Sequence, residues 1–460
     1  MKSSALSPEI FKAYDIRGIV HKTLTPHTVH QIGMAIGSEA LERGEKTIVV
    51  GRDGRLSGPE LVDVLTEGLA STGCNVIDVG MVPTPLLYFA TYELGTGSGV
   101  AVTGSHNPPD YNGLKMMLGG ETLAGNAIQS LRQRVLDGNL LSGRGAVSQS
   151  SVLDAYLNRL TSDIKLNRPL KIVIDCGNGV AGVIAPALFK KIGCDVIELF
   201  CDVDGQFPNH HPDPSQLENL TDLINGVRQH NADIGLAFDG DGDRLGVITP
   251  AGEIIWPDRQ LLLFAKDLLD VQPGAEIIYD VKCTRLLPEA IKAAGGRPLM
   301  WKTGHSFIKA KLKETGAALA GEMSGHLFFN ERWYGFDDGL YAGARMCELV
   351  SRHPQDPQSL FDTIPNSVNT PELRMEMDEG EHYTLIEELV DKADFDDGDV
   401  SNIDGLRVDF EFGFGLIRAS NTTPMLIMRF EANHQEGLKI IQDRFRALIN
   451  SVRPGLAIPF

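Results

Sequence analysis

The sequence predicts an α/β fold: three α/β mixed-sheet domains followed by a smaller C-terminal α+β domain. Two observations support this prediction. Short runs of β-branched residues alternate with helical stretches, and this rhythm begins anew near residues 47, 171 and 276. The end of the chain departs from it, with an alternating strand and a closing amphipathic helix. A length of 460 residues suits about three domains of ~150 residues, or four compact ones.

The first domain is expected over residues 1–150. Its short Ile and Val runs predict buried strands, and the amphipathic segment between two of them predicts a helix. The polar stretch at residues 142–151 marks the end of the domain. The expected elements are a strand at 47–50, a helix at 59–72, and strands at 75–79 and 99–102.

The same pattern continues in a second domain, residues 151–254, and a third, residues 255–366. The turn at 250–257 separates them, and the proline-containing stretch at 352–365 ends the third. In the second domain we expect a strand at 171–175, a helix at 180–192, and strands at 195–200 and 235–238. In the third we expect a strand at 276–280, a helix at 286–294 and a strand at 298–301.

The fourth domain is expected over residues 367–460. An acidic, turn-rich stretch precedes residues 406–412, where apolar and polar residues alternate as in a half-buried strand. A second strand at 425–430 and an amphipathic helix at 435–451 complete a small α+β domain.

The charge balance is strongly acidic. There are 42 Lys and Arg residues against 61 Asp and Glu residues, so the formal net charge is −19. This balance argues against a general nucleic-acid binder and against a binder of anionic membranes, because both need a basic surface. It favours a soluble cytosolic protein that keeps its positive charge for local pockets.

The cysteines and the start of the chain suggest a compartment. Six cysteines are scattered without a CxxC pair, which is typical of a reducing environment and gives no zinc pattern. Residues 1–12 have no long apolar core and no basic leader, so we expect no signal peptide. No run of about 18 apolar residues occurs in the sequence. We therefore expect a cytoplasmic protein with no membrane partner.

The sharpest motif is Asp-Gly-Asp-Gly-Asp-Arg at residues 239–244, directly after a predicted buried strand. Like charges ~4 Å apart repel by about 1 kcal/mol in water and several-fold more inside a protein, so a loop crowded with three acids is expected to hold a cation. All-oxygen ligands favour Mg²⁺ or Ca²⁺ over zinc, and Pro250 stands where an EF-hand needs its Glu. The alternative is a solvated acidic turn.

The segment Thr-Gly-Ser-His-Asn-Pro at residues 103–108 also follows a predicted strand, with Lys115 ten residues after the serine. Ser105 is a candidate nucleophile or phosphate carrier. The alternative is a turn stabilised by the Ser or Asn side chain and ended by the prolines. His106 is interpreted as a structural hydrogen-bonding residue rather than a base. Ser105 and His106 alone are not expected to form a catalytic triad, because the side chains of adjacent residues usually diverge.

Residues 418–424, with the sequence RASNTTP, supply hydrogen-bond donors without an acid. A planar guanidinium, hydroxyls, an amide and turn N–H groups are the parts of a phosphate pocket. The alternative is a polar hairpin loop.

Three weaker signals remain. Glu322 and Ser324 stand two residues apart at a predicted strand end, where they suit neighbouring sugar hydroxyls. His305 opens a predicted helix, whose first N–H groups attract anions. Arg17 is either a site residue or the partner of Asp15 in a surface ion pair.

Taken in order, the motifs AYDIRG, TGSHNP, DGDGDR, GEMSGH and RASNTTP span the chain and resemble those of the α-D-phosphohexomutase superfamily. The sugar and phosphate motifs resemble the bacterial phosphomannomutase/phosphoglucomutase branch, whereas phosphoglucosamine mutases tend to have Gln in place of Met323. Gly104 departs from the pattern, because Ala is common there, but the change removes no chemical group. The resemblance implies four domains around a central cleft.

The resemblance also implies a role for each motif. Ser105 would carry the phosphate, and the three aspartates of the acidic motif would hold Mg²⁺ with a phosphoserine oxygen. Glu322 and Ser324 would bind the 3- and 4-hydroxyl groups of the sugar. The implied metal ligands are Ser105, Asp239, Asp241 and Asp243. The residues implied around the reacting phosphoryl group are Arg17, Lys115, Arg244 and His326. The other residues implied around the substrate are Tyr14, Lys282, His305, Arg418, Ser420, Asn421 and Thr422.

The implied reaction is the reversible transfer of a phosphoryl group between O1 and O6 of mannose and glucose phosphates. The phosphoserine gives its phosphoryl group to the free hydroxyl, and the 1,6-bisphosphate turns over before Ser105 takes back the other phosphate. We expect glucose 1,6-bisphosphate as activator, sugar phosphates as partners, and a monomer. The alternatives are a phosphoglucosamine mutase, a metal-dependent phosphatase, and a non-catalytic protein that binds sugar phosphates or cations.

Overall fold

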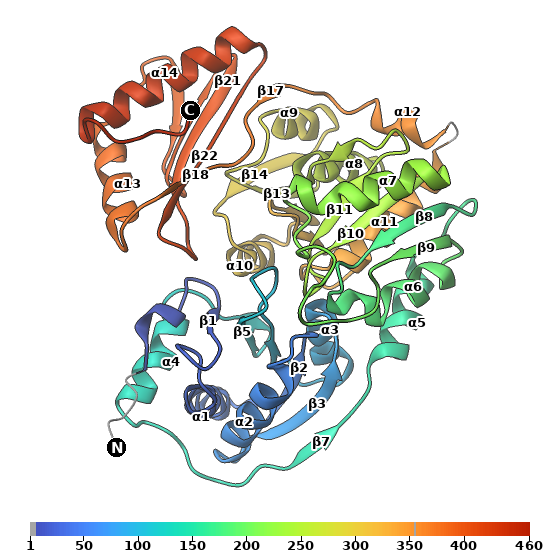
Figure 1. Cartoon of the computed structure of the whole chain (residues 1–460), viewed down its shortest axis with the longest axis vertical. Helices are drawn as coiled ribbons and strands as arrows, with labels where there is room; N and C mark the ends of the chain where they lie inside the picture. The colour runs from blue at the N-terminus through green and yellow to red at the C-terminus, as the bar shows by residue number, and fades with distance from the viewer. Residues whose placement is uncertain (1–5, 354–355) are drawn as a thin grey trace.

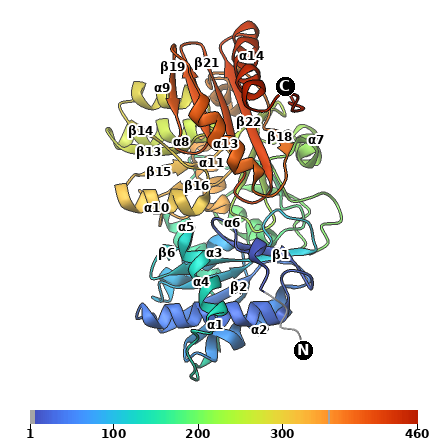
Figure 2. The ribbon, with the colours of Figure 1, turned by 90° about the vertical axis from the view of Figure 1, so that its left-hand side faces the viewer.

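Four β-sheets follow one another along the chain in the computed structural model, which describes residues 6–353 and 356–460. Figure 1 shows them in chain order, from the N-terminal sheet at the bottom, through two central sheets, to the C-terminal sheet at the upper left. Figure 2 shows the first and last sheets at opposite ends of the molecule. The expected three α/β domains and C-terminal α+β domain are confirmed.

The first sheet is mixed, with the strand order β1-β5-β4-β2-β3-β7 and β6 paired with β5. Strands β4, β2, β3 and β7 run parallel, and β5 runs antiparallel to β1 and β4. Its strands are β1 (Ile16–Ile19), β2 (Thr47–Arg52), β3 (Asn75–Met81), β4 (Gly99–Val102), β5 (Tyr111–Leu118), β6 (Glu121–Thr122) and β7 (Val147–Gln149). Its helices are η1 (Pro8–Ile10), α1 (Pro26–Glu42), α2 (Gly58–Ala70), α3 (Thr84–Glu93) and α4 (Asn126–Leu136).

The second sheet has the order β12-β11-β10-β8-β9. Its three long strands are parallel, and β11 turns back antiparallel to β10. The strands are β8 (Lys171–Asp175), β9 (Asp195–Leu199), β10 (Ile234–Phe238), β11 (Leu245–Ile248) and β12 (Ile254–Ile255). The helices are α5 (Leu153–Asp163), η2 (Val180–Val183), α6 (Ala185–Lys191), η3 (Leu217–Leu220) and α7 (Thr221–His230).

The third sheet has the order β14-β13-β15-β16, with the first three strands parallel and β16 antiparallel. The strands are β13 (Glu276–Asp280), β14 (Arg297–Trp301), β15 (Leu319–Gly321) and β16 (Leu327–Phe329). The helices are α8 (Pro257–Val271), α9 (Leu286–Ala293), α10 (His305–Thr315), α11 (Gly339–Arg352) and α12 (Pro357–Phe361).

The C-terminal sheet is antiparallel in every pair, with the order β17-β22-β21-β20-β19 and β18 paired with β22. The strands are β17 (Val368–Asn369), β18 (Leu373–Glu376), β19 (Gly398–Ser401), β20 (Leu406–Phe410), β21 (Gly413–Ala419) and β22 (Met425–Ala432). The helices α13 (Glu381–Lys392) and α14 (Gln435–Val452) pack on the sheet.

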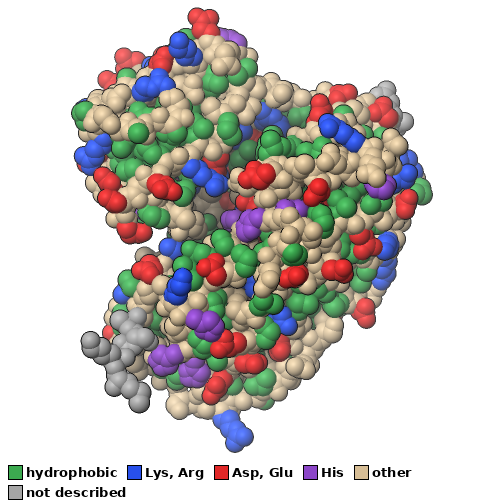
Figure 3. Space-filling view, viewed as in Figure 1, with side chains coloured by type: hydrophobic (Ala, Val, Ile, Leu, Met, Phe, Trp, Pro, Cys, Tyr) green, Lys and Arg blue, Asp and Glu red, His purple; other side chains and the backbone are tan. Residues whose placement is uncertain are grey.

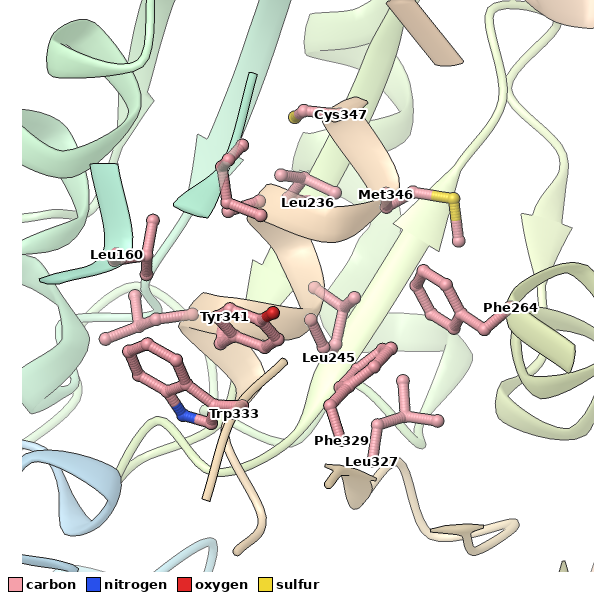
Figure 4. Packing of buried hydrophobic residues seen from close by; sticks show 14 of the residues in the cluster. Leu160, Leu236, Leu245, Phe264, Leu327, Phe329, Trp333, Tyr341, Met346 and Cys347 are labelled. Atoms are coloured by element: carbon pink, nitrogen blue, oxygen red, sulfur yellow. The ribbon is translucent and has the colours of Figure 1, made fainter. Parts of the chain in front are cut away.

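The second and third sheets share one hydrophobic core, which also takes in α3 and one face of the first sheet. The other face of the first sheet and the last sheet have cores of their own. In Figure 4, Leu236 and Leu245 of the second sheet meet Leu327 and Phe329 of the third around Tyr341 on α11. Burial of such side chains stabilises by roughly 1.5–3 kcal/mol each. The two central sheets are therefore held as one block, which fixes the loops at their strand ends relative to each other.

Two expected elements were wrong in detail. The helix expected at 180–192 is divided at Ile184 into η2 and α6, because Pro186 fits only in the first turn of a new helix. The strand expected at 406–412 ends at Phe410 and is not half-buried: four of its five residues are buried. Its polar face is covered because Arg407 donates to the carbonyls of Val281 and Cys283, beside the third sheet.

The expected linkers contain short elements: β7 lies in 142–151, β12 in 250–257 and α12 in 352–365. Residues 354–355 of the last stretch, and residues 1–5 of the start that was expected to lack a leader, lie outside the described residues. In the part of the chain that the structure describes, no helix has the length and apolar character needed to span a membrane.

Candidate active site

Three of the motifs follow strands that lie parallel to a neighbour. The serine loop (residues 103–109) follows β4, the acidic loop (239–244) follows β10, and the sugar loop (322–326) follows β15. Ligands of open α/β sheets bind outside the carboxyl ends of such strands. The last motif, the phosphate loop (418–424), joins β21 to β22. Figure 3 shows the surface hollowed between the C-terminal lobe and the lobe below it, with histidine side chains at the inner end.

The serine loop points its hydroxyl at the acidic loop. Ser105 is buried, and its Oγ lies 3.3 Å from Asp239 Oδ2 and 3.1 Å from His106 Nδ1. The expectation that the Ser105 and His106 side chains diverge was therefore wrong. Ser105 has a left-handed backbone with φ of 51°, and this accounts for the contact. Burial and the charge of Arg244 hold the pKa of His106 well below its usual value, so the ring is neutral at pH 7.

The acidic loop is a cage of three buried carboxylates. Asp239, Asp241 and Asp243 are each 0% exposed. Lys115 of β5 enters the cage, with its Nζ 2.7 Å from Asp241 Oδ2 and 2.5 Å from Asp243 Oδ2. Burial acts to raise the pKa of Asp243, but Lys115, His326 and Arg244 together outweigh it and the pKa is lowered well below the usual value. Asp239 lacks that contact, so burial and its two acidic neighbours raise its pKa well above the usual value.

The cage fits a divalent cation. Each aspartate offers a carboxylate oxygen, and the three oxygens lie within 4.8 Å of one another. Asp241 Oδ1 is buried and has no hydrogen-bond partner among the described residues, and Asp243 Oδ1 is buried with only His326 Nε2 near it, at 3.3 Å. Leaving buried carboxylate oxygens unsatisfied is costly, and an all-oxygen donor set suits Mg²⁺. The acidic loop could therefore bind a metal ion.

The sugar loop contacts the acidic loop through His326. Its Nε2 lies 3.3 Å from Asp243 Oδ1, and its Nδ1 lies 3.0 Å from Glu322 Oε2 and 2.9 Å from Ser324 Oγ. Burial acts to lower the pKa of His326, but Asp243 and Glu322 together outweigh it and raise the pKa to about 9. Glu322 also accepts from the backbone N–H of Gly304. The carboxylate and the hydroxyl therefore converge on one histidine.

Helix α10 brings His305 to the same place. Lys309, one turn further on, donates to His305 Nδ1 at 3.0 Å and to Asp337 Oδ1 at 2.7 Å. Because Nδ1 accepts this bond, the hydrogen of the neutral ring is on Nε2. Burial and Lys309 hold the pKa of His305 well below its usual value. His305 Nε2 is buried without a partner among the described residues, so it is a free donor.

Basic and aromatic side chains complete the cluster. Arg17 of β1 donates to Asn107 Oδ1 at 2.7 Å and forms an ion pair with Asp15 that is buried, not at the surface as the alternative had it. The ring of Tyr14 meets His305 edge-on at 5.2 Å. The Nε of Arg244 lies 3.8 Å from Asp239 Oδ2.

The phosphate loop lies apart from this cluster. Arg418 is anchored by Asp404, with Nε 3.0 Å from its Oδ2, and Asn421 donates to the Thr303 carbonyl at 3.3 Å. A cavity of about 350 Å³ opens between this loop and the first domain, and Ser420, Asn421 and Thr422 are among the residues that line it. Neither Ser105 nor the three aspartates line that cavity.

The structure thus brings most of the expected residues together. Ser105, the acidic loop, Lys115 and Arg244 form one contact network with the sugar loop and His305. Lys282 is not part of it, because its Nζ pairs with Glu372 at 3.0 Å on the C-terminal domain. The phosphate loop is connected to this network indirectly, through hydrogen bonds at Thr303, the residue before Gly304 and His305.

Comparisons with known proteins agree on one family. Four family models match in order, described as phosphoglucomutase/phosphomannomutase alpha/beta/alpha domains I, II and III and C-terminal domain, at residues 8–140, 154–252, 256–368 and 372–448. A phosphomannomutase/phosphoglucomutase of Pseudomonas aeruginosa is 56% identical over 459 residues, which cover 100% of this chain and 99% of that protein. The chain belongs to the phosphoglucomutase/phosphomannomutase family.

Solved structures of the family have the same fold. A phosphoglucomutase/phosphomannomutase family protein from Burkholderia thailandensis matches with a TM-score of 0.94 and 54% identity, over 99% of this chain and 100% of that one. An N-acetylphosphoglucosamine mutase of Aspergillus fumigatus, described in complex with glucose 1,6-bisphosphate, matches with a TM-score of 0.58 and 13% identity, over 99% and 97% of the two chains. The second likeness shows the shared fold alone.

Sequence reasoning missed residues that hold the family's motifs in place. Thr84 donates to Asp241 Oδ2 at 2.6 Å, and Lys309 and Asp337 orient His305. Thr84 could not be found because it is distant in sequence. Asp53 and Arg55, which contact the serine loop, directly follow strand β2. The rule that identified the other motifs, polar residues after a buried strand, would have found this pair.

Proposed function

We propose that this chain is a phosphomannomutase/phosphoglucomutase, which moves a phosphoryl group reversibly between O1 and O6 of mannose and glucose phosphates. The observation that supports this best is the position of Ser105 Oγ, 3.3 Å from a carboxylate oxygen of a fully buried acidic cage. The near-complete match to a relative of that name supports the same activity.

Ser105 is the proposed phosphate carrier. In the forward step the bond between phosphorus and Ser105 Oγ breaks, a bond from phosphorus to the free sugar hydroxyl forms, and that hydroxyl loses its proton. The reverse step takes the phosphate from the other end of the 1,6-bisphosphate. Such transfer depends on positioning and on charge stabilisation. Arg17, Lys115 and Arg244 supply positive charge beside Ser105, and His326 and Lys115 are the candidates for moving the proton.

Asp239, Asp241 and Asp243 are the proposed ligands of Mg²⁺, with a phosphoserine oxygen as a further ligand. When bound there, Mg²⁺ supplies positive charge that offsets the repulsion between the aspartates and the phosphoserine. The unpartnered buried Oδ1 of Asp241 supports this assignment.

The substrate is proposed to lie between the sugar loop and the phosphate loop. Glu322 and Ser324 bind the 3- and 4-hydroxyl groups, which keep similar places when the sugar turns end for end. Arg418, Ser420, Asn421 and Thr422 bind the phosphate far from Ser105, and the cavity that Ser420, Asn421 and Thr422 line supports a site at this loop. Tyr14, Lys282 and His305 are the remaining proposed contacts. A site that does not read C2 accepts both glucose and mannose.

A coupled assay on glucose, mannose and glucosamine 1-phosphates, with Mg²⁺ and a trace of glucose 1,6-bisphosphate as activator, tests the proposal. We expect comparable turnover of the glucose and mannose compounds and loss of turnover in Ser105→Ala. Intact-mass measurement should find one phosphate on the wild type and none on the variant. Higher turnover of the glucosamine compound would favour a phosphoglucosamine mutase, and release of inorganic phosphate a phosphatase.

The domain boundaries after residues 150, 254 and 366, the monomeric state and the cytoplasmic location stay predictions from the sequence. Size-exclusion chromatography with light scattering checks the oligomeric state.

A further inference from the structure

Arg55, just after β2, is fully buried beneath the serine loop, and all five of its N–H donors are used. Four of them go to backbone carbonyls of the segment that carries Ser105. The guanidinium donates to the carbonyls of Ser105 at 2.8 Å, Asn107 at 2.6 Å, Tyr111 at 3.1 Å and Pro108. The fifth donor, Nε, binds Asp53 Oδ2 at 3.1 Å. One planar group thus gathers carbonyls that would otherwise repel one another.

Asp53 holds the start of the serine loop by accepting hydrogen bonds from it. Its Oδ2 also accepts from the Thr103 hydroxyl at 2.8 Å and from the Gly104 N–H at 3.1 Å. Thr103 Oγ1 in turn accepts from the Ser105 N–H at 2.8 Å. The N–H and the carbonyl of Ser105 are therefore both held by a chain of bonds that ends at Arg55 and Asp53.

Ser105 needs such support. Its φ of 51° is one that a residue with a side chain adopts only where the surroundings impose it. This conformation directs Oγ toward Asp239 and, as described above, toward His106. Gly104 allows the close approach, because a Cβ there would lie 2.4 Å from the Arg55 guanidinium carbon.

The second domain covers the same arginine. Phe207 stacks over the guanidinium at 5.2 Å, and His211 contacts the carbonyl of His106. Arg55 makes none of its described hydrogen bonds to the acidic, sugar or phosphate loops. Beyond the interaction of its charge with Asp241, which a lysine would keep, its effect on the chemistry passes through the backbone of the serine loop.

We propose that Arg55, oriented by Asp53, is a positioning residue that sets the backbone of the serine loop so that Ser105 Oγ faces the acidic cage and the incoming phosphoryl group. This inference rests on the proposed function, since it assigns Arg55 to the phosphoryl transfer of Ser105. Lysine cannot take its place: an ammonium is a point charge with three donors and lacks the planar fork that spans four carbonyls.

The test compares Arg55→Lys with Arg345→Lys. Arg345 of α11 is also buried, and its guanidinium binds Glu331 in the core shared by the central sheets, away from the serine loop. For each variant we would measure kcat and KM for glucose 1-phosphate, the melting temperature, and the rate at which dephosphorylated protein takes phosphate from glucose 1,6-bisphosphate, followed by intact mass.

Arg55→Lys should lower kcat and the phosphorylation rate by about 10²-fold, as expected for misplacement of a reacting group by ~1 Å. Its KM should stay within about twofold, because the proposed sugar and phosphate contacts are untouched. Arg345→Lys should lower the melting temperature while kcat stays within about twofold. If both arginines had a merely structural role, the two variants would behave alike. A fall in kcat at unchanged KM in Arg55→Lys alone would therefore support the positioning role.

An Arg55→Lys protein with wild-type kcat and phosphorylation rate would overturn the inference, as would an equal loss of kcat in Arg345→Lys. If Arg55→Lys does not fold, Asp53→Asn decides, since it keeps the shape but loses the charge: reduced kcat at unchanged KM supports the inference, and unchanged kcat overturns it. Different results would refute the proposed function and the proposed role of Arg55. Wild-type protein without mutase turnover would refute the function, whereas wild-type turnover with fully active Arg55 variants would refute only the role of Arg55.

Discussion

At the scale of residues, the candidate site is an arrangement of buried charge. Three fully buried aspartates would repel one another, and Lys115 relieves this by contacting two of them. The third, Asp239, is the one that faces Ser105 Oγ. A divalent cation bound in the cage would share two of these carboxylates with Lys115, and each would weaken the binding of the other.

Replacing Lys115 by Met should separate the contribution of Lys115 to phosphoryl transfer from its competition with the metal ion. We expect kcat to fall by about 10²-fold, because a positive group beside the reacting phosphoryl is lost. We expect Mg²⁺ to bind at least about tenfold more tightly, since like charges ~4 Å apart repel by about 4 kcal/mol in a protein-like medium before relaxation reduces it. Calorimetric titration of Mg²⁺ and steady-state kinetics measure the two effects.

Thr84→Val is the matched control for Lys115→Met. It removes a neutral donor to the same Asp241 oxygen and leaves the charge of the cage unchanged. Its Mg²⁺ affinity should stay within about threefold of the wild type. Weaker Mg²⁺ binding in Lys115→Met would contradict the view that the ammonium competes with the cation.

The sequence allowed Ser105 and the three aspartates to be predicted, because each motif is local: acids and glycines, or a hydroxyl and prolines, follow one strand. The contact between Lys115 and the acidic loop could not be predicted, because it joins β5 of the first domain to a loop of the second. The meeting of Ser105 with His106 was mispredicted because it depends on a left-handed φ that composition does not reveal.

The raised pKa of Asp338 predicts that the stability of the folded protein depends on pH. Burial raises its pKa to about 7, against the hydrogen bonds from Tyr341 N–H, Tyr156 and Trp333 that lower it. The folded protein thus binds this proton more tightly than the unfolded chain, and the contribution of Asp338 to stability is lost as the pH rises from about 4 to about 7. Melting temperatures of the wild type and Asp338→Asn across this range measure it.

Asp338→Asn keeps the side-chain oxygen that caps α11 but loses the oxygen that accepts from Trp333. That loss does not depend on pH, so the pH-dependent part of the difference in stability reports the titration of Asp338. The stability of the wild type relative to the variant should fall as the pH rises from about 4 to about 7 and should level off above that range. A difference that stays constant, or grows with pH, would show that Asp338 is not protonated in the folded protein.

At the scale of elements, the site depends on loops at the carboxyl ends of parallel strands, which hydrophobic runs in the sequence predict well. Sequence periodicity was a less reliable guide where packing against another domain determines which residues are buried. Alternation indicated a half-buried strand at residues 406–412, yet the polar residue Arg407 is buried against the third domain. The expected helix at 180–192 was divided by a proline whose effect the pattern did not reveal.

Gly240→Ala should push the serine and acidic loops apart. A Cβ at Gly240 would lie 2.3 Å from the carbonyl oxygen of Ser105, which is backbone and cannot swing away. We expect kcat to fall by about ten- to a hundredfold, because the hydroxyl moves relative to the cage. Kinetics and a crystal structure of the variant measure the effect.

Gly193→Ala is the control for Gly240→Ala. A Cβ there meets no atom within 4 Å, so only the backbone strain at its φ of 105° acts. It should lower the melting temperature and leave kcat unchanged. Equal kcat in Gly240→Ala and the wild type would show that the two loops need not touch for activity.

At the scale of the whole molecule, the domains are joined unequally. The central sheets share a core, whereas the C-terminal domain rests on the third through a small apolar cluster and through polar contacts. Thr284 donates to Glu431 at 2.7 Å, and Arg429 to Asp258 at 3.1 Å. Polar interfaces of this kind between domains permit relative motion. The phosphate loop is carried by the domain with the weaker attachment, and it faces the first domain across a cavity.

Binding of a sugar bisphosphate should therefore draw the C-terminal domain inward. A phosphate held by Arg418 and Asn421 connects that domain to a sugar held by the sugar loop, and the gap beside the phosphate loop leaves room to close. Closure would also exclude water from the phosphoserine. Small-angle X-ray scattering should show a smaller radius of gyration when glucose 1,6-bisphosphate and Mg²⁺ are added. Arg418→Gln should lose much of this contraction, and an unchanged radius at saturating ligand in the wild type would mean that the domains do not move.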